Sequence, residues 1–304
     1  MGEIEYIWTL QARLKETMSK IKRHIRKDEL NDIFSLYSKQ SWLCEKEDSL
    51  LELLLLCETS DNKKLIIKLL NDFNYLDKRV LSTYLSLIAD YIITDSGFSQ
   101  DTCQVAAITF DDEADSSQKI LDYIKMPLFL KGWDNFKPVN RYGATMKNYI
   151  DGRNQIIFID EFIGSGQTIL GRIKQLNNDI REDFDLKFCF IAGMDYGIKK
   201  IEELGYEVFC PLRLPKGITE SFAEEDVEFS LNNMKGLEEK LAANINGFDL
   251  RDYSLGYNGA EALYTLEGNL GNTPNSVFPI FWWPRSFDNL ERQTLLTRFE
   301  RGLK

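Results

Sequence analysis

Two adjacent acids followed by a loop of small residues form the part of this chain best suited to chemistry. Asp160 and Glu161 follow an unbroken apolar run at residues 156–159, which predicts a strand buried on both faces of a parallel sheet. Carboxylates accept hydrogen bonds from hydroxyls or bind a hard cation, and a small-residue loop lets backbone N–H groups approach an anion. The loop consists of Gly164, Ser165, Gly166, Gln167 and Thr168.

A helix with one apolar face is expected directly after this loop. Ile169, Ile173, Leu176 and Ile180 follow one another at intervals of four, three and four residues, which is the spacing of an amphipathic helix. The N-terminus of such a helix presents unpaired N–H groups, and these favour an anion. The order of strand, acid pair, glycine loop and helix therefore predicts a phosphate-binding site beside two carboxylates.

Other nucleotide-binding motifs share parts of this pattern. A P-loop ATPase needs a G-x-x-x-x-G-K-[ST] loop upstream of its acidic strand, and no glycine before Ile156 begins one. Within the loop itself, Gln167 stands where the lysine of that motif would be. A Rossmann fingerprint would need a third glycine at the position of Ile169. The remaining simple alternative is an ordinary strand-to-helix turn.

The complete signature resembles that of the type I phosphoribosyltransferases: four apolar residues, two acids, two mostly apolar residues and a small-residue loop ending in Thr. The resemblance implies that Asp160 and Glu161 hold the ribose hydroxyls, directly or through Mg²⁺. It also implies that residues 164–168 wrap the 5′-phosphate of phosphoribosyl pyrophosphate (PRPP) or a nucleotide, and that Phe162 packs against the base. Gly164 departs from the family, in which many members carry an acid or Thr at this position.

Length and composition set the broad class of the protein. A chain of 304 residues, 43% apolar and with only seven prolines, predicts about two globular domains. Its apolar runs are far shorter than a membrane span, no signal peptide is expected, and the five scattered cysteines predict reduced thiols in the cytoplasm. The single histidine, His24, excludes His-based triads, and the net charge of −11 argues against nonspecific coating of nucleic acid.

Residues 1–96 are expected to form helices only, as an N-terminal helical domain. Apolar residues between Ile4 and Ile25 recur at heptad spacing, which predicts an amphipathic first helix. Its other faces are basic. They are either solvated surface or a docking face for an acidic protein partner or a nucleic-acid backbone, for which the candidate residues are Lys20, Arg23, Arg26 and Lys27.

Residues 97–304 are expected to form an α/β domain with a parallel sheet. Further strands are predicted at 105–110, 186–192 and 207–210, with helices from Ser116 or Ser117 to Lys125, at 195–204, 219–232 and 237–245. Asp195 is expected at the carboxyl edge of the sheet, where ligands bind. In the resembled family the loop after an early strand binds pyrophosphate. Here the corresponding loop at 111–117 is acidic and would repel a pyrophosphate unless a metal intervened. Residues 132–143 form either a flap over a phosphate or a structured loop.

The last segment, residues 211–304, is predicted to form a C-terminal hood over the site. A glycine-rich stretch at 254–264 precedes an Asn-Thr-Pro-Asn turn at 272–275 and a cluster of aromatic residues at 278–284. The cluster is either core or, through Phe281 and Trp282, a stacking surface for a base. This combination resembles the divergent phosphoribosyltransferase-like proteins of bacterial antiphage and conflict systems, retron-associated ones among them.

Three functions agree with these features. The first is an enzyme that acts at a ribosyl N-glycosidic bond, a glycosyltransferase or a nucleotide N-glycosidase, as an effector in antiphage defence. The second is a non-catalytic sensor or adaptor subunit that binds a nucleotide or PRPP within a defence complex. The third is a purely structural adaptor that uses the basic helix.

Overall fold

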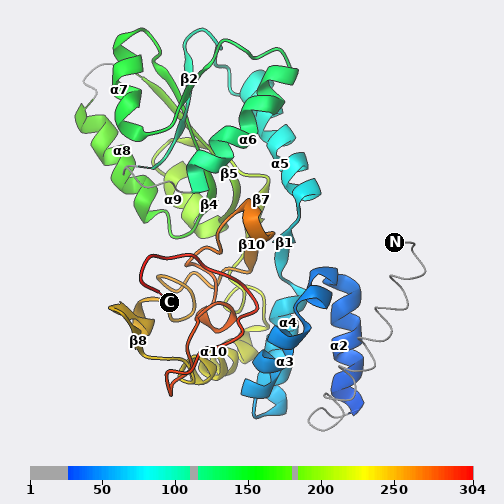
Figure 1. Ribbon diagram of the computed structural model, residues 1–304. Helices are drawn as coiled ribbons and strands as arrows, with labels where there is room; N and C mark the ends of the chain where they lie inside the picture. The colour runs from blue at the N-terminus through cyan, green and yellow to red at the C-terminus, as the bar shows by residue number, and fades with distance from the viewer. Residues whose placement is uncertain (1–26, 110–115, 180–183, 304) are drawn as a thin grey trace.

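A parallel sheet of six strands lies at the centre of the upper half of the molecule in Figure 1. The strand order is β3-β2-β4-β5-β6, and β7 pairs with the end of β5. All of these pairings are parallel. The strands are β2 (Cys103–Ala107), β3 (Lys137–Val139), β4 (Gln155–Ile163), β5 (Asp185–Met194), β6 (Glu207–Phe209) and β7 (Leu212–Leu214).

Helices cover both faces of the sheet, which confirms the expected α/β class with a parallel sheet. Ile157 and Ile159 of β4 are buried on one face with helices α5 and α6, and Ile156 and Phe158 are buried on the other with α7, α8 and α9. The alternation follows from the period of two along a strand. The helices are α5 (Lys78–Asp90), α6 (Ser116–Leu130), α7 (Tyr142–Ile150), α8 (Gln167–Asp179) and α9 (Asp195–Glu202).

The computed structural model describes residues 27–109, 116–179 and 184–303. The expected first helix lies outside this range, as do the acidic residues 111–115 and Ile180. Of the basic docking candidates, only Lys27 is described, and it begins α2. Among the described helices, none has both the length and the apolar character needed to span a membrane.

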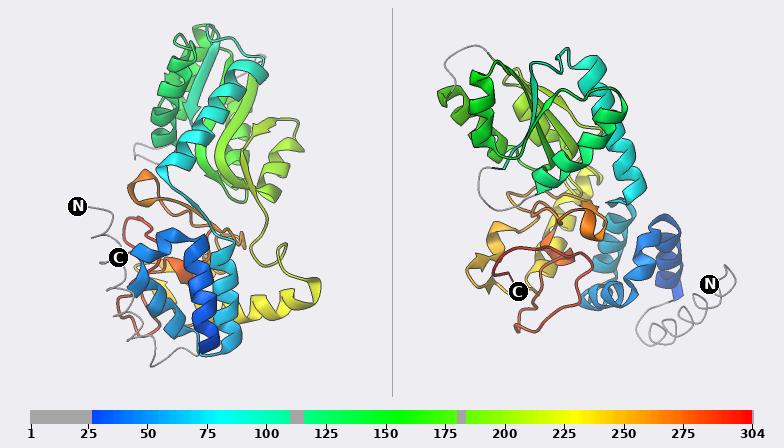
Figure 2. Two further views of the ribbon diagram at one scale, coloured as in Figure 1. Left: turned by 90° about the vertical axis from the view of Figure 1, so that its right-hand side faces the viewer. Right: turned by 45° about the horizontal axis from the view of Figure 1, so that its top comes forward.

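Three further helices pack beside the hood in the lower half of the molecule (Figures 1 and 2), namely α2 (Lys27–Lys39), α3 (Glu47–Leu56) and α4 (Ser60–Asn71). The Thr59 side chain caps α4 by accepting the N–H of Asn62 at 3.1 Å. The expectation of helices only up to residue 96 is wrong at one place. Strand β1 (Asn74–Leu76) pairs in parallel with β10 (Tyr264–Leu266) of the hood, where the two halves of the molecule meet.

The hood has little regular structure and holds its shape through buried side chains. It contains one long helix, α10 (Glu224–Glu238), and a small hairpin of β8 (Asn244–Ile245) and β9 (Phe248–Asp249). A single helix over 224–238 therefore stands in place of the two expected at 219–232 and 237–245, and it overlaps most of the first. The Trp283 indole N–H donates to the Ala242 carbonyl at 3.0 Å. This side chain therefore satisfies a buried carbonyl that no regular strand pairing satisfies.

The helical part and the hood share one core. Phe73 packs edge-on against Phe281, with ring centroids 6.0 Å apart, and α4 contacts α10. The same cluster of buried apolar residues continues into the α5–α6 face of the sheet. Residues 132–143 were predicted to form either a flap or a structured loop. They contain the edge strand β3, the buried Trp133 and the first residues of α7. They are part of the fold.

Candidate functional site

The order of the strands creates a site between the carboxyl ends of β2 and β4. From β2 the chain passes through α6 to β3 on one side, and α7 then returns it to β4 on the other side of β2. Connections that leave in opposite directions open a crevice, which is where sheets of this kind bind ligands. A cavity of about 600 Å³ lies here. Ser116 at the start of α6 donates a hydrogen bond to Asp160 on β4 at 3.1 Å.

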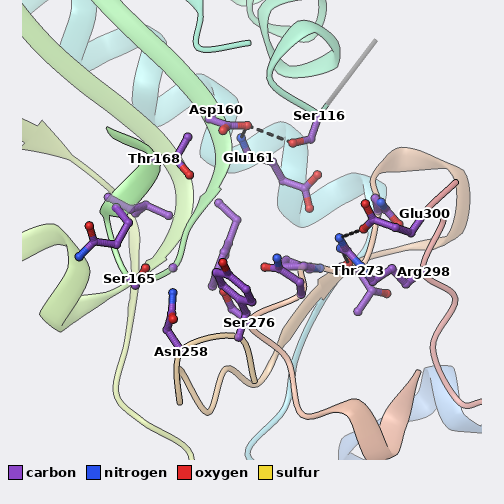
Figure 3. Close-up of a pocket in the computed structure, with 18 of the residues that line it drawn as sticks. Ser116, Asp160, Glu161, Ser165, Thr168, Asn258, Thr273, Ser276, Arg298 and Glu300 are labelled. Carbon is purple, nitrogen blue, oxygen red and sulfur yellow. Dashed lines mark hydrogen bonds and ion pairs between the residues drawn. The ribbon is translucent and has the colours of Figure 1, made fainter. Parts of the chain in front are cut away.

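The cavity has two walls of different construction (Figure 3). The first, called the sheet wall, is the continuous run of residues 160–169 from the end of β4 to the start of α8. The second, called the hood wall, consists of three separate segments at 257–258, 272–276 and 298–301. The expected acid pair, the whole glycine loop and Phe162 all line this one cavity. A single ligand can therefore contact all of them.

The acids lie within β4 and not after it, which corrects the expected strand end. Strand β2 stops at Ala107, opposite Ile159, while β4 continues to Ile163 beside β5. Beyond Ile159, no strand among the described residues pairs with this edge of β4, and the Asp160 carboxylate accepts the N–H of Glu161 at 2.7 Å. The side chain of Asp160 takes the place of a neighbouring strand, so the acids extend past β2 into the cavity.

Glu161 is buried and unusually weak as an acid. Its side chain is only 2% exposed. Burial and the negative charge of Asp160 raise its pKa to about 8, although a backbone hydrogen bond from Asn272 and the charge of Lys119 act in the opposite direction. Its Oε1 atom has no hydrogen-bond partner among the described residues. A buried polar atom without a partner that lines a cavity is suited to a ligand.

The glycine loop packs so tightly that side chains would not fit. A Cβ atom on Gly197 of α9 would lie 2.0 Å from the Gly164 carbonyl oxygen, and one on Gly164 would lie 2.3 Å from the Ser276 Oγ of the hood wall. Gly166 has φ +78°, a conformation that favours glycine. A side chain at 164, where the resembled family often has a larger residue, would require the Ser276 hydroxyl to rotate away.

Behind the loop lies a positive charge. Helix α8 begins at Gln167, directly after the loop, so its first N–H groups lie at the cavity. The Lys200 ammonium donates to the Ser165 carbonyl at 3.3 Å. Ser165 and Thr168 add hydroxyl groups at this end of the cavity (Figure 3). Neutral donors backed by one cation fit a phosphate group.

Three residues considered at the sequence level lie away from the cavity. Phe281 and Trp282, the candidates for base stacking, are buried in the shared core, and the Trp282 indole N–H donates to the Val277 carbonyl at 2.9 Å. Their predicted stacking role is therefore wrong, because a fully covered ring has no face for a base. Asp195 begins α9 and pairs with Lys199 at 2.6 Å and Arg213 at 3.3 Å. Phe162 lines the cavity, and its ring stacks on that of Tyr264 with the ring centroids 5.0 Å apart.

Most of the hood wall was not predicted. The glycine-rich stretch at 254–264 and the Asn-Thr-Pro-Asn turn carry part of the family resemblance, and they supply Tyr257, Asn258 and residues 272–275. Left-handed backbone at Leu255 (φ +58°) and Asn258 (φ +58°) shapes the first of these stretches. No sequence signal identified Ser116 or the segment 298–301, whose residues Arg298, Phe299, Glu300 and Arg301 are those of an ordinary surface.

The acid pair offers carboxylate oxygens, which are ligands that Mg²⁺ binds. Among the described residues, no group of three or more His, Cys, Asp or Glu side chains is placed to hold a metal ion. Proteins usually hold Mg²⁺ through one or two carboxylates together with phosphates of the substrate. The half-buried Asp160 and the unpartnered Oε1 of Glu161 fit that arrangement.

Comparison with known families identifies the family of this chain. The family model PRTase-CE matches residues 15–298, which is nearly the whole chain. The chain belongs to the PRTase-CE family. The expected phosphoribosyltransferase-like domain is thereby confirmed. Among solved structures, an orotate phosphoribosyltransferase from Aeropyrum pernix is similar over 43% of this chain and 70% of its own, with 11% identity and a TM-score of 0.28. A search of curated proteins found no match.

Proposed function

We propose that this protein binds the 5′-phosphate of a nucleotide or of PRPP and acts at the ribosyl N-glycosidic bond. The observation that supports this most is the joint position of the acid pair and the neutral loop in one cavity at the switch point of the sheet. A phosphate on residues 164–168 would be held by N–H and hydroxyl groups. The ribose, a few ångströms away, would then lie beside Asp160 and Glu161.

The two acids are suited to different tasks. Asp160 is half-buried, and as a carboxylate it accepts hydrogen bonds from ribose hydroxyls and stabilises positive charge at C1′ as the glycosidic bond lengthens. Glu161, with a pKa of about 8, is mostly protonated near neutral pH and can donate a hydrogen bond. Mg²⁺ held by both acids would displace the Glu161 proton and would neutralise charge on the phosphate oxygens of the ligand. The remaining catalysis is positioning of the ligand between the two walls.

A second candidate function is a sensor or adaptor that binds the same ligand without turning it over. It is favoured by four acids at Asp111, Asp112, Glu113 and Asp115, in the stretch where the resembled family binds pyrophosphate. For either function we propose a cytoplasmic role in bacterial antiphage defence, on the resemblance alone. We also propose that Lys20, Arg23, Arg26 and Lys27 dock an acidic partner or a nucleic-acid backbone. Reversing these four charges should abolish that association, which salt should also weaken.

Ligand-dependent stabilisation tests the site. Ribose 5-phosphate, nucleoside 5′-monophosphates or PRPP should raise the melting temperature, because they bind only the folded state. The nucleosides without phosphate should do much less. Equal responses with and without phosphate would remove the loop from the proposal.

Catalysis is tested separately, by product analysis after incubation with PRPP or nucleotides. We expect Asp160→Asn combined with Glu161→Gln to keep the fold, shown by an unchanged far-UV spectrum, and to abolish product formation. A double variant that is fully active would exclude the acids from catalysis. Binding by the wild type without any product would favour the sensor.

A further inference from the structure

A second cavity adjoins the first at the end of the hood wall. Its volume is about 540 Å³. Ser116, Asn272 and Phe299 line both cavities and therefore form the boundary between them. The rest of its lining comes from α6 and the turn before Asn272, and consists of Gln118, Lys119, Asp122, Tyr123 and Gly271.

Phe299 combines an exposed ring with a fixed backbone. Its side chain is 80% exposed, although the residue lies at the edge of two cavities. The Asn272 side-chain amide donates to the Phe299 carbonyl and accepts the Phe299 N–H, both at 2.8 Å. The backbone that carries the ring is therefore held in position although the ring itself is not packed, which lowers the entropy cost of placing a ligand against it.

The neighbouring residue fixes the segment further. Arg298 donates to the Thr273 carbonyl at 2.7 Å, pairs with Glu300 and lies over the Trp282 ring at 5.5 Å. Trp282 is part of the buried core, so the segment that carries Phe299 is anchored to the interior of the hood. An exposed aromatic ring on such an anchored segment is a ready surface for a planar group.

The order of groups along the cavity gives the direction of the ligand. Ser165 and Thr168 lie at one end, Asp160 and Glu161 lie between, and Thr273, Arg298 and Glu300 lie at the other end (Figure 3). In a nucleotide, the ribose joins the 5′-phosphate to the base. This step rests on the proposed function: with the phosphate on the loop and the ribose at the acids, the C1′ substituent is directed toward the segment that carries Phe299.

We propose that Phe299 stacks on the base of a bound nucleotide and that the base extends into the second cavity. Gln118, Lys119 and Asp122 there carry donors and acceptors for the edge of a heteroaromatic ring. The ligand class is accordingly a nucleoside 5′-phosphate, whose base contributes to affinity. Stacking of one base on an aromatic side chain corresponds to roughly a tenfold to hundredfold gain in affinity.

Calorimetric titration of the full chain tests the proposal. The ligands are ribose 5-phosphate and the 5′-monophosphates of adenosine, guanosine, cytidine and uridine. At least one nucleotide should bind about tenfold or more tightly than ribose 5-phosphate. Phe299→Ala should remove most of this difference in affinity, and Phe299→Tyr should keep it. Neither variant should change the affinity for ribose 5-phosphate.

Phe287→Ala is the matched control, because Phe287 is a hood phenylalanine that is 74% exposed and lines neither cavity. It should behave as the wild type. The proposal is overturned if no nucleotide binds more tightly than ribose 5-phosphate, or if the nucleotide preference survives Phe299→Ala. In both cases ribose 5-phosphate still binds and the proposed function stands. Absence of binding by every one of these ligands, and by PRPP, would instead reject the proposed function.

Discussion

The sheet wall and the hood wall face the same cavity but are built in different ways. The sheet wall comes from one continuous run and presents mainly backbone N–H groups and two acids to the cavity. The hood wall comes from three separate segments and offers side chains, among them Asn258, Arg298 and Phe299. Backbone groups suit what all ribose phosphates share. Side chains suit the part that differs from one ligand to another, so we expect selectivity to depend on the hood.

The two walls also differ in what holds them in place. Regular strand pairing fixes the sheet wall. The hood wall depends on individual polar contacts, such as that of the Arg298 guanidinium, which donates to the Thr273 carbonyl at 2.7 Å. Substitutions can therefore distinguish the roles of the two walls. Changes in the sheet wall should affect binding of the ribose phosphate, and changes in the hood wall should affect binding of the base.

The largest effect is expected for Glu161→Gln, as a change in how stability depends on pH. The folded-state pKa of about 8 lies above the ordinary value of 4.5. Between these values the folded state keeps a proton that the unfolded state has lost, so stability falls as the pH rises. The wild type should lose about 3 kcal/mol more than the variant between about pH 5 and pH 8, measured by urea unfolding.

The exposed Glu239→Gln is the matched control and should leave the pH dependence unchanged. Glu238, whose pKa burial raises to about 7, is present in all three proteins and cancels in the comparison. Parallel pH profiles for the wild type and Glu161→Gln would show that Glu161 is ionised in the folded protein. The sheet wall would then present two negative charges to the ligand.

The second prediction compares two helical glycines. Glycine to alanine in a helix ordinarily stabilises it, by roughly 1 kcal/mol. Gly171→Ala in α8, where nothing lies within 4 Å of the new methyl group, should do so. Gly197→Ala in α9 should instead destabilise the protein by about 1–3 kcal/mol, because its methyl group would meet the Gly164 backbone.

Gly197→Ala should also weaken ribose 5-phosphate binding, because the loop must move to accommodate the methyl group. Unfolding curves and calorimetry measure both effects. If both alanine variants stabilise the protein to the same degree, the loop is not packed against α9 as described.

The third prediction concerns the hood wall. Asn272→Ala removes both hydrogen bonds that fix Phe299, so the nucleotide should bind several-fold more weakly while ribose 5-phosphate binding is unchanged. Asn275→Ala removes the same chemical group from the same turn and keeps these two hydrogen bonds. Equal losses in the two variants, by calorimetry, would mean that the turn as a whole and not the fixed position of Phe299 determines the affinity.

The smallest effect is expected for Lys200→Met, which removes the cation behind the loop. Loss of one partly exposed charge near a helix N-terminus should weaken phosphate binding about two- to fivefold, and less at high salt. Lys199→Met is the control, because Lys199 is exposed and pairs with Asp195 away from the cavity. Similar losses in both variants, measured over a salt series, would show only a general charge effect.

The sheet wall was predictable from the sequence because its elements have strong local signals. Residues 156–159 are apolar without interruption since both faces of β4 are covered, and the apolar face of α8 follows its helical period. The end of β4 was predicted too early because the Asp160 carboxylate accepts the Glu161 N–H, a hydrogen bond that a neighbouring strand would otherwise accept. Acids normally end a buried strand, and nothing local indicated that β2 would stop first.

The hood wall could not be predicted because its contacts have no sequence period. Strand β1 has only three residues, too few to show an alternation. Trp282 and Phe299 are both aromatic, and only the tertiary structure shows that one is buried and the other exposed. The segment 298–301 is charged around its single aromatic ring, as many solvated segments are. Its role depends on Asn272, which is distant in sequence.

The pairing of β1 with β10 has a consequence for how the protein is made. Asn74 bonds to Leu263, which lies 189 residues later in the chain. During synthesis at about 5–20 residues per second, β1 waits roughly ten to forty seconds for its partner. The helices before it can form early, but a contact this distant in sequence closes late. The nascent chain therefore cannot close the first cavity until residues beyond 264 have emerged, and the hood wall is complete only after residues 298–301 have been made.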